Sequence, residues 1–181
     1  MKSNATLGEG VYYATADYAG MCRRVLALAA DLGVVVLAWY GLWAALVLFD
    51  PSPVGNGSPD ALPLIWLGLA YLYLVVVKPS RVRSLGYWLT GTKIVTLRGE
   101  RPSILRMTFR LALWVLGPFN VCYDLIWMGI DDDRQSLRDA FAGTYVVKRN
   151  ARPVGRGEIH LATYFAFGFT LMYPKVTRVS R

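Results

Sequence analysis

One apolar run sets the strongest limit on what this chain can fold into. Val25 to Phe49 is 25 residues long, and Asp31 is the only charged residue in it. At about 1.5 Å per residue a helix of this length reaches roughly 37 Å, which exceeds the ~30 Å hydrocarbon core of a bilayer. The run is too long for the apolar part of a signal peptide, and no small-residue cleavage site follows it. It is therefore predicted to stay in the mature protein and to cross a membrane with some tilt.

Two further apolar runs extend this interpretation. Ala61 to Val77 is uncharged over 17 residues and is followed by Lys78, whose long side chain can reach the membrane interface. Leu111 to Ile130 is a third run of 20 residues, interrupted by Asn120 and Asp124. The chain is 55% hydrophobic and 18% charged, which is more apolar than soluble proteins usually are. We therefore predict an all-α membrane protein, a small transmembrane helical bundle with two spans, an irregular third segment, and short amphipathic and β-rich segments outside the membrane.

Basic residues are distributed unevenly around these runs. Arg23 and Arg24 precede the first run. The connection from Asp50 to Asp60 has no Lys or Arg, whereas Lys78 to Arg110 has eight. Because basic residues flank spans on the cytoplasmic side, the N-terminus is predicted to be cytoplasmic in a multi-pass protein of the cell membrane, the inner membrane in a bacterium. The net charge of +8 is interpreted as an orientation signal beside the lipid bilayer, so no nucleic-acid partner is predicted.

The end of the chain conflicts with a simple topology of three spans. Three crossings would export Asp131 to Arg181, which holds nine Lys and Arg. Either the third segment turns back at Gly117-Pro118 without crossing, or the neighbouring aspartates accompany an exported tail. Val11 to Gly20 and Ile159 to Gly168 share Ala-Thr and a terminal Gly at the same offsets, and pairing of these ends as strands would place them on one side. We therefore predict that both termini face the cytoplasm.

Two short stretches are rich in residues that favour β-strands. They are Lys93 to Leu97, which ends at Arg-Gly-Glu, a sequence that predicts a turn, and Thr144 to Val147, which follows the third apolar run. The two stretches can pair with each other on one side of the membrane. Two unrelated extended loops fit the same composition, so both interpretations stay open.

Four blocks of sequence resemble a known family in their order and spacing. The blocks are Arg24 with Ala27 and Asp31, SLGYWLTGTKIV, RPSILRMTFR and RQSLRDAFAGTYVV. Together they resemble the RDD family of small membrane proteins, whose name records one arginine and two aspartates. The resemblance extends from about Ala19 to Lys148. It implies a membrane protein for which transport has been suggested, with cation/proton antiport described for some members.

The resemblance divides the chain into three parts. They are an N-terminal cytoplasmic segment (1–20), an RDD-like membrane domain (21–148) with spans at about 25–49 and 61–77 and a third apolar segment at about 111–130, and a C-terminal extension (149–181). The sequence departs from the family at Gly86-Tyr87, where the family often has Gly-Lys, and at Arg138, where it often has His. Roles that need that Lys or a His-Asp pair are therefore not expected here.

The resemblance implies that Arg24, Asp31 and Asp139 are the signature residues. Asp31 lies about two turns inside the first span, where a bare carboxylate costs at least ~2.5 kcal/mol. It is either a titrating or cation-binding group, or a structural group held by an Arg or a backbone donor from another segment. Asp139 is expected to accept hydrogen bonds from backbone or Arg donors between Ser84 and Arg110, and so to join two polar blocks.

Polar residues in and before the third segment suggest a route for ions. Arg110, Asn120 and Asp124 fall on one stripe of a straight helix, and if that stripe faces Asp31 the four residues form a candidate ion or proton pathway. Pro118 interrupts this helix. Broken helices expose backbone to ions in many transporters, but ordinary proline kinks are more common.

Other chemistry finds little support in the sequence. His160 is the single histidine, there is no phosphate-binding glycine loop, and Cys22 and Cys122 make no metal-binding pattern. We therefore expect no enzymatic activity, no cofactor and no metal. Two functions stay open: transport coupled to cations or protons, and a non-catalytic assembly or scaffold module. The small size and few spans favour a homo-oligomer or a membrane partner protein.

Overall fold

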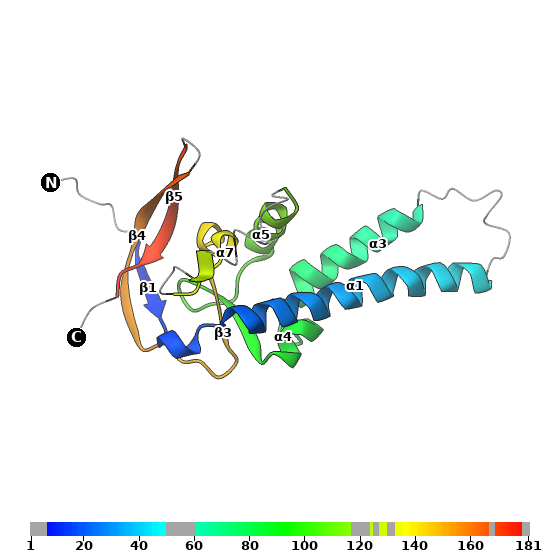
Figure 1. Cartoon of the computed structure of the whole chain (residues 1–181), viewed down its shortest axis with the longest axis horizontal. Helices are drawn as coiled ribbons and strands as arrows, with labels where there is room; N and C mark the ends of the chain where they lie inside the picture. Colours follow the sequence, from blue (N-terminus) through cyan, green and yellow to red (C-terminus); the bar gives the residue numbers. More distant parts are fainter. Residues whose placement is uncertain are drawn as a thin grey trace.

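A pair of apolar helices forms one end of the molecule. In the computed structural model the described residues are 7–49, 61–116, 124, 127–129, 133–166 and 169–178. Helix α1 (Met21–Phe49) lies beside α3 (Ala61–Tyr71), and α3 continues into the π-helical η2 (Leu72–Val77). Figure 1 shows α1 and α3 projecting together from a body made of all the other elements.

That body contains short helices and two antiparallel sheets. Its elements are β1 (Glu9–Tyr12), η1 (Thr15–Asp17), α4 (Leu85–Leu89), β2 (Thr92–Thr96), α5 (Ile104–Leu116), α7 (Leu137–Ala142), β3 (Thr144–Lys148), β4 (Gly155–Ala166) and β5 (Phe169–Val176). The strands form a three-stranded sheet in the order β1-β4-β5 and a two-stranded sheet of β2 and β3.

The prediction of an all-α bundle is wrong. Besides the two sheets, the described residues contain one helix long and apolar enough to cross a membrane, Met21–Leu48, with Ala61–Val77 as a shorter apolar helix. The third apolar run contributes the end of α5, an amphipathic helix that begins at Ile104 in the polar block before the run. Pairing between distant segments decides where strands form, and local apolar periodicity does not reveal it.

The two β-rich stretches pair with each other, which decides between the two interpretations that the sequence left open. Strand β2 lies antiparallel to β3, with Thr92 opposite Lys148 and Thr96 opposite Thr144. The alternative of two unrelated loops is therefore wrong. An isolated bridge between Tyr18 and Val147 then ties the stretch before α1 to this sheet.

The two ends of the chain also pair, but in a different register from the one that their similarity suggests. In β1 and β4, Val11 lies opposite Arg156 and Glu9 lies opposite Glu158. From Ile159 onward β4 pairs with β5, with Ile159 opposite Val176. The shared Ala-Thr pattern therefore does not mark partner residues, although the two ends do come together in one sheet.

One buried cluster lies within the body, and a second joins the body to the start of α1. In the first, the rings of Tyr13, Tyr18 and Tyr145 meet edge to face, with centroids 5.3, 6.0 and 6.4 Å apart. The second joins α1, η2, α4, β2, α5 and β3 through the side chains of Ala19, Ala27, Val75, Tyr87, Ile94, Met107 and Val146. Five other elements thus converge on the first half of α1, where Arg24 and Asp31 lie.

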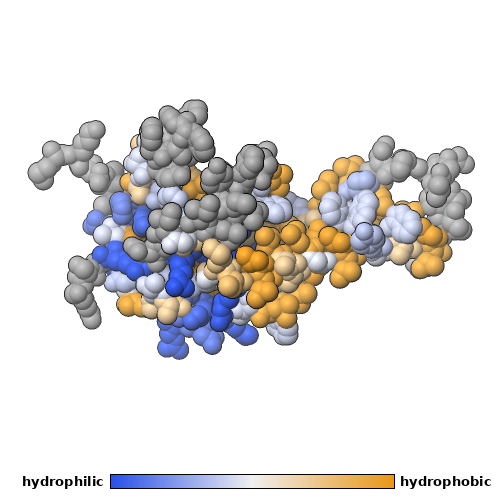
Figure 2. Space-filling model, in the orientation of Figure 1, coloured by the Kyte–Doolittle hydropathy of each residue, from blue (hydrophilic) through white to orange (hydrophobic). Residues whose placement is uncertain are grey.

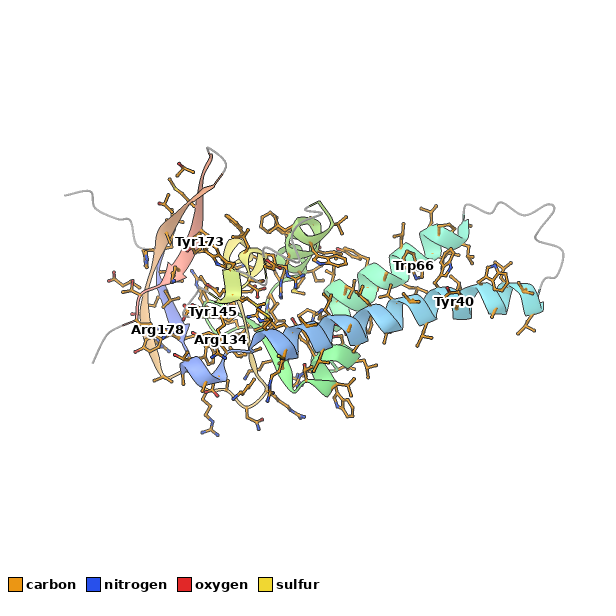
Figure 3. All side chains as sticks on the ribbon, viewed as in Figure 1. Tyr40, Trp66, Arg134, Tyr145, Tyr173 and Arg178 are labelled. Atoms are coloured by element: carbon orange, nitrogen blue, oxygen red, sulfur yellow. The ribbon has the colours of Figure 1, made fainter. Side chains whose placement is uncertain are left out.

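The projecting helices present their apolar side chains outward. Leu37, Leu48 and Leu64 are among the most exposed residues of α1 and α3, and Figure 2 shows apolar colouring along this pair. The helices contact each other through Trp66, whose indole N–H donates to the Val35 carbonyl at 2.9 Å. Figure 3 places Tyr40 and Trp66 on this pair, far from the body. Exposed leucines on a helical pair are what a bilayer would cover.

Candidate functional site

Asp31 is fully buried and accepts four hydrogen bonds. Its carboxylate lies 2.7 Å from Lys78 Nζ, 2.9 Å from the Gly86 amide nitrogen, 3.0 Å from Ser84 Oγ and 3.1 Å from the Tyr73 hydroxyl. These donors come from η2, the loop after it and α4. The side chain of Lys78 therefore turns inward to this carboxylate, which corrects the expectation that it extends to the membrane interface.

Gly86 allows α4 to approach α1 closely enough for this contact. A Cβ atom at Gly86 would lie 2.1 Å from the Ala27 carbonyl oxygen and 2.7 Å from Asp31 Oδ1. Real Cβ atoms do not tolerate such distances, so any other residue would push the two helices apart. The glycine of the SLGYW block thus places a backbone N–H on Asp31.

Asp139 is the centre of a second cluster of ion pairs. It lies in α7, is fully buried, and pairs with Arg24 and with Arg110, whose Nη2 is 2.5 Å away. Arg24 also donates to the backbone carbonyls of Ala19 and Arg134, at 3.0 and 2.6 Å. The expected contact with an Arg between Ser84 and Arg110 is present as the ion pair with Arg110, and Arg24 adds a partner that the sequence did not indicate.

The charges around Asp139 keep it ionised. Burial alone would raise the pKa of this carboxyl, but Arg110, Arg24 and Arg138 outweigh burial and lower its pKa from 3.8 to about 2. A buried carboxylate with such partners stays charged at any physiological pH. Asp139 is therefore suited to hold α1, α5 and α7 together and unsuited to exchange protons.

Asp124 pairs with a different arginine. Its carboxylate lies 2.9 Å from Arg138 Nε and accepts the Arg138 backbone N–H at 3.3 Å. Burial raises the pKa of Asp124, and the charge of Arg138 offsets this in part. The candidate pathway is thus only partly assembled in the described residues: Asp124 reaches the same cluster through Arg138, while Asn120 lies outside the described residues.

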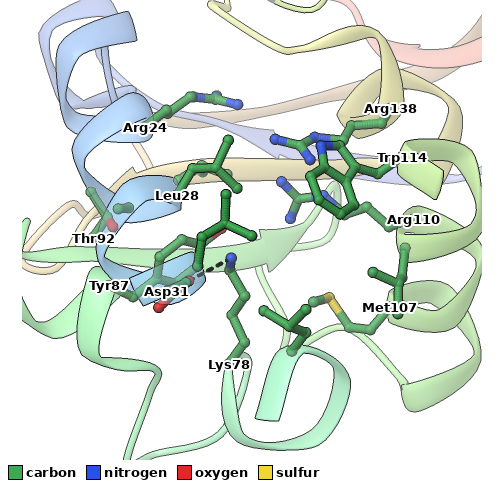
Figure 4. A pocket seen from close by; sticks show the side chains of 15 residues that line it. Arg24, Leu28, Asp31, Lys78, Tyr87, Thr92, Met107, Arg110, Trp114 and Arg138 are labelled. Carbon is green, nitrogen blue, oxygen red and sulfur yellow. Dashed lines mark hydrogen bonds and ion pairs between the residues drawn. The ribbon is translucent and has the colours of Figure 1, made fainter. Parts of the chain in front are cut away.

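Both clusters border one cavity of about 70 Å³ between α1, η2, α4, α5 and α7. Arg24 and Asp31 line it from α1, Lys78 lines it from the end of η2, and Arg110 lines it from α5. In Figure 4 the side chains of Lys78, Arg110 and Arg138 point toward its centre, and the dashed line joins Lys78 to Asp31. By this measure one water needs about 10–15 Å³, so the cavity can admit several waters or a small charged group.

No group of three or more His, Cys, Asp or Glu side chains in the described part of the chain is arranged to hold a metal ion. The acidic side chains of the site instead form ion pairs with arginine and lysine. The arrangement can therefore crosslink helices or attract an anion, and it offers no cluster of oxygen ligands for a cation.

The sequence of the chain matches a known protein family. Residues 18–143 match the profile of the RDD family, which is more than half of the chain. The chain belongs to the RDD family. This match confirms the resemblance carried by the four sequence blocks, and RDD proteins are generally membrane-associated. No curated protein and no solved structure shows a significant match to the chain.

The three signature residues of the RDD resemblance lie around the same cavity. Arg24 and Asp31 line it, and Asp139 pairs with two of its lining arginines. The sequence did not identify Lys78, Trp114 and Arg138 as members of the site. Arg138 was visible as a departure from the RDD pattern beside Asp139, and Lys78 as the residue that follows the second run. Trp114 carried no signal beyond its place in an apolar segment.

Proposed function

We propose that this RDD protein is a non-catalytic, multi-pass membrane module that holds a folded β-rich body against the cytoplasmic face of the membrane and acts through a partner protein or a second copy. The observation that carries this proposal is that each signature side chain crosslinks separate elements. Asp31 joins α1 to η2 and α4, and Asp139 joins α1 to α5 and α7.

The bonding of Asp31 supports a structural role. An ionised carboxylate has about four lone-pair sites, and four donors already occupy those of Asp31. A cation could bind here only by displacing Lys78. Removal of one partner from a buried ion pair commonly costs about 3–5 kcal/mol, so these contacts are well suited to fix the arrangement of helices.

The pairing of the chain ends supports a topology with an even number of crossings. Strand β1 precedes α1, and β4 follows every apolar run, yet the two strands share a sheet. Strands in one sheet lie on one side of a membrane, so α1 and the α3–η2 pair would make the two crossings. The basic residues on both flanks favour the cytoplasm for that side.

Ion-coupled transport is the second candidate, and one observation favours it. The Asp31–Lys78 pair borders the cavity beside the π-helical η2, and π-helical turns frequently occur at functional sites. In this mechanism a proton or cation would replace Lys78 at Asp31, and Lys78 would move into the cavity. A transporter of this size would need to act as an oligomer.

Asp31→Asn separates these two candidates. In the module proposal the variant loses about 3 kcal/mol of stability, and wild-type protein in liposomes gives no more cation or proton flux than protein-free liposomes. In the transport candidate the wild-type protein conducts and the variant does not. Thermal unfolding in detergent and fluorescence flux assays on the same preparations provide the two readouts.

Asp17→Asn, the same substitution in η1, is the matched control and should leave both stability and flux unchanged. Wild-type flux that Asp31→Asn abolishes would overturn the module proposal.

A further inference from the structure

The cavity beside the two ion-pair clusters carries an excess of positive charge. Its lining contains four basic residues, which are Arg24, Lys78, Arg110 and Arg138. These pair with three carboxylates, which belong to Asp31, Asp139 and Asp124. Among the described residues this group therefore holds one more positive than negative charge in a largely buried place, where an unbalanced charge is unfavourable.

Two buried donors in the cavity wall have no hydrogen-bond partner among the described residues. They are Nη1 of Arg110, a residue only 7% exposed, and Nε1 of Trp114. Buried polar groups in folded proteins are almost always bonded to protein, water or a ligand. Both donors belong to α5 and are one helical turn apart, so one acceptor group can serve both. The two donors therefore need a hydrogen-bond acceptor, and the excess of positive charge favours an acceptor that is negatively charged.

Tyr87, in the cavity wall, is also affected by the positive charges of the site. Burial would raise the pKa of its hydroxyl, yet the charges of Arg110 and Lys78 outweigh burial and lower that pKa. Lys78 Nζ also lies 4.7 Å from the centre of the Tyr87 ring. The interior of this site thus favours an anion over a neutral group.

We propose that this cavity binds the phosphate group of an anionic membrane lipid. Guanidinium groups present paired N–H donors that match phosphate oxygens, and one phosphodiester carries the single negative charge that the site lacks. This proposal goes beyond the assembly role proposed above and does not depend on it.

The rim of the cavity explains why a lipid fits better than a free phosphate ion. The leucines among its lining residues are Leu28, Leu32, Leu74 and Leu111. Leu32 is 37% exposed on α1, the helix that also carries the exposed Leu37 and Leu48. A headgroup can therefore lie among the basic residues while its acyl chains follow these leucines. Basic pockets between membrane helices on the cytoplasmic side are known to hold lipid headgroups.

The test measures the thermal stability of the purified full chain in neutral detergent with three additives: phosphatidylglycerol, phosphatidylcholine and inorganic phosphate. A ligand that binds only the folded state raises the melting temperature, and the stabilisation grows with the logarithm of the ligand concentration divided by Kd. We expect phosphatidylglycerol to raise it and the zwitterionic phosphatidylcholine to raise it much less. Trp114→Phe keeps an aromatic side chain but removes the indole N–H donor, so binding of phosphatidylglycerol should weaken by about tenfold without loss of folding.

Two further variants make the result specific. Trp43→Phe makes the same change at an exposed tryptophan of α1 and should bind phosphatidylglycerol like the wild type. Arg110→Lys keeps the charge for Asp139 but removes the second donor, and it should weaken binding if the variant folds. Equal stabilisation by inorganic phosphate would overturn the assignment to a lipid. Wild-type affinity in Trp114→Phe, or no stabilisation by phosphatidylglycerol, would overturn the site itself.

Discussion

Arg24 and Asp139 form an ion pair across 115 positions of sequence, with side chains that are 8% and 0% exposed. The pair connects the first turn of the longest apolar helix to α7, a six-residue helix in the β-rich body. Because Arg110 pairs with the same carboxylate, three helices meet at one buried charge. The relative positions of the apolar helices and the body therefore depend on contacts between segments that are far apart in the sequence.

The first prediction concerns the stability that this junction provides. Asp139→Asn should lower the free energy of unfolding by about 3–5 kcal/mol, because Arg24 and Arg110 are then left buried without a carboxylate. Glu9→Gln breaks the exposed pair of Glu9 with Arg156, whose side chains are 72% and 78% exposed, and should cost no more than about 1 kcal/mol. Thermal unfolding in detergent compares the two. Similar losses in both variants would show that Asp139 is no special junction.

The second prediction follows from the depressed pKa of Asp139. The pKa of Asp139 falls from 3.8 in the unfolded chain to about 2 in the folded protein, which corresponds to roughly 2 kcal/mol of stability. This stabilisation is fully present at a pH above the unfolded pKa, and it is lost as the pH falls through the folded pKa. Stability should therefore decline between about pH 5 and pH 2, and Asp139→Asn should flatten this decline. Unfolding followed at a series of pH values measures both slopes.

Asp124 should have the opposite effect on how stability depends on pH, because its pKa shifts in the opposite direction to that of Asp139. Its folded pKa is raised, so the folded state binds its proton first and gains stability as pH falls. Asp124→Asn should therefore steepen the acid decline that Asp139→Asn flattens. A shift in the same direction for both variants would contradict the assignment of opposite pKa changes.

The outcome at Asp31 shows what local sequence can predict. A single carboxylate in an apolar run indicated that it must find partners, and the structure supplies four. The identity of those partners was not predictable, because Tyr73, Lys78 and Gly86 reach it through a turn whose geometry depends on packing. Lys78 could equally have extended to the interface, since a lysine at the end of an apolar run satisfies either arrangement.

For the two sheets, too, the sequence predicted some of the strands but not how they pair. Strand propensity identified the stretches that became β2 and β3, since each is short and rich in β-branched residues. It could not identify the three-stranded sheet, because β1 pairs with a part of β4 that begins with Gly-Arg-Gly and has no alternating apolar pattern. The similarity between the two ends of the chain gave proximity but the wrong register, which long-range packing determines.

The third prediction tests the close contact between α1 and α4. Gly86→Ala should destabilise the protein by about 1–3 kcal/mol or more, because the new methyl group would overlap the Ala27 carbonyl and crowd Asp31. Gly33→Ala is the matched control on α1, since a Cβ there meets nothing within 4 Å, and helix propensity favours alanine by about 1 kcal/mol. The two alanine variants should therefore shift the melting temperature in opposite directions. Equal shifts would contradict the close approach of the helices.

The last prediction concerns the side of the membrane on which the paired ends lie. Since β1 and β4 share a sheet and basic residues flank both apolar helices, both ends should face the cytoplasm. In a background lacking Cys22 and Cys122, single cysteines at Ala14 and Arg152 should resist an impermeant thiol reagent in intact cells. A cysteine at Ser58, in the connection without Lys or Arg, should react. All three should react after the cells are opened, which controls for accessibility. Labelling of Arg152→Cys but not Ala14→Cys in intact cells would mean an odd number of crossings, which is incompatible with β1 and β4 in one sheet.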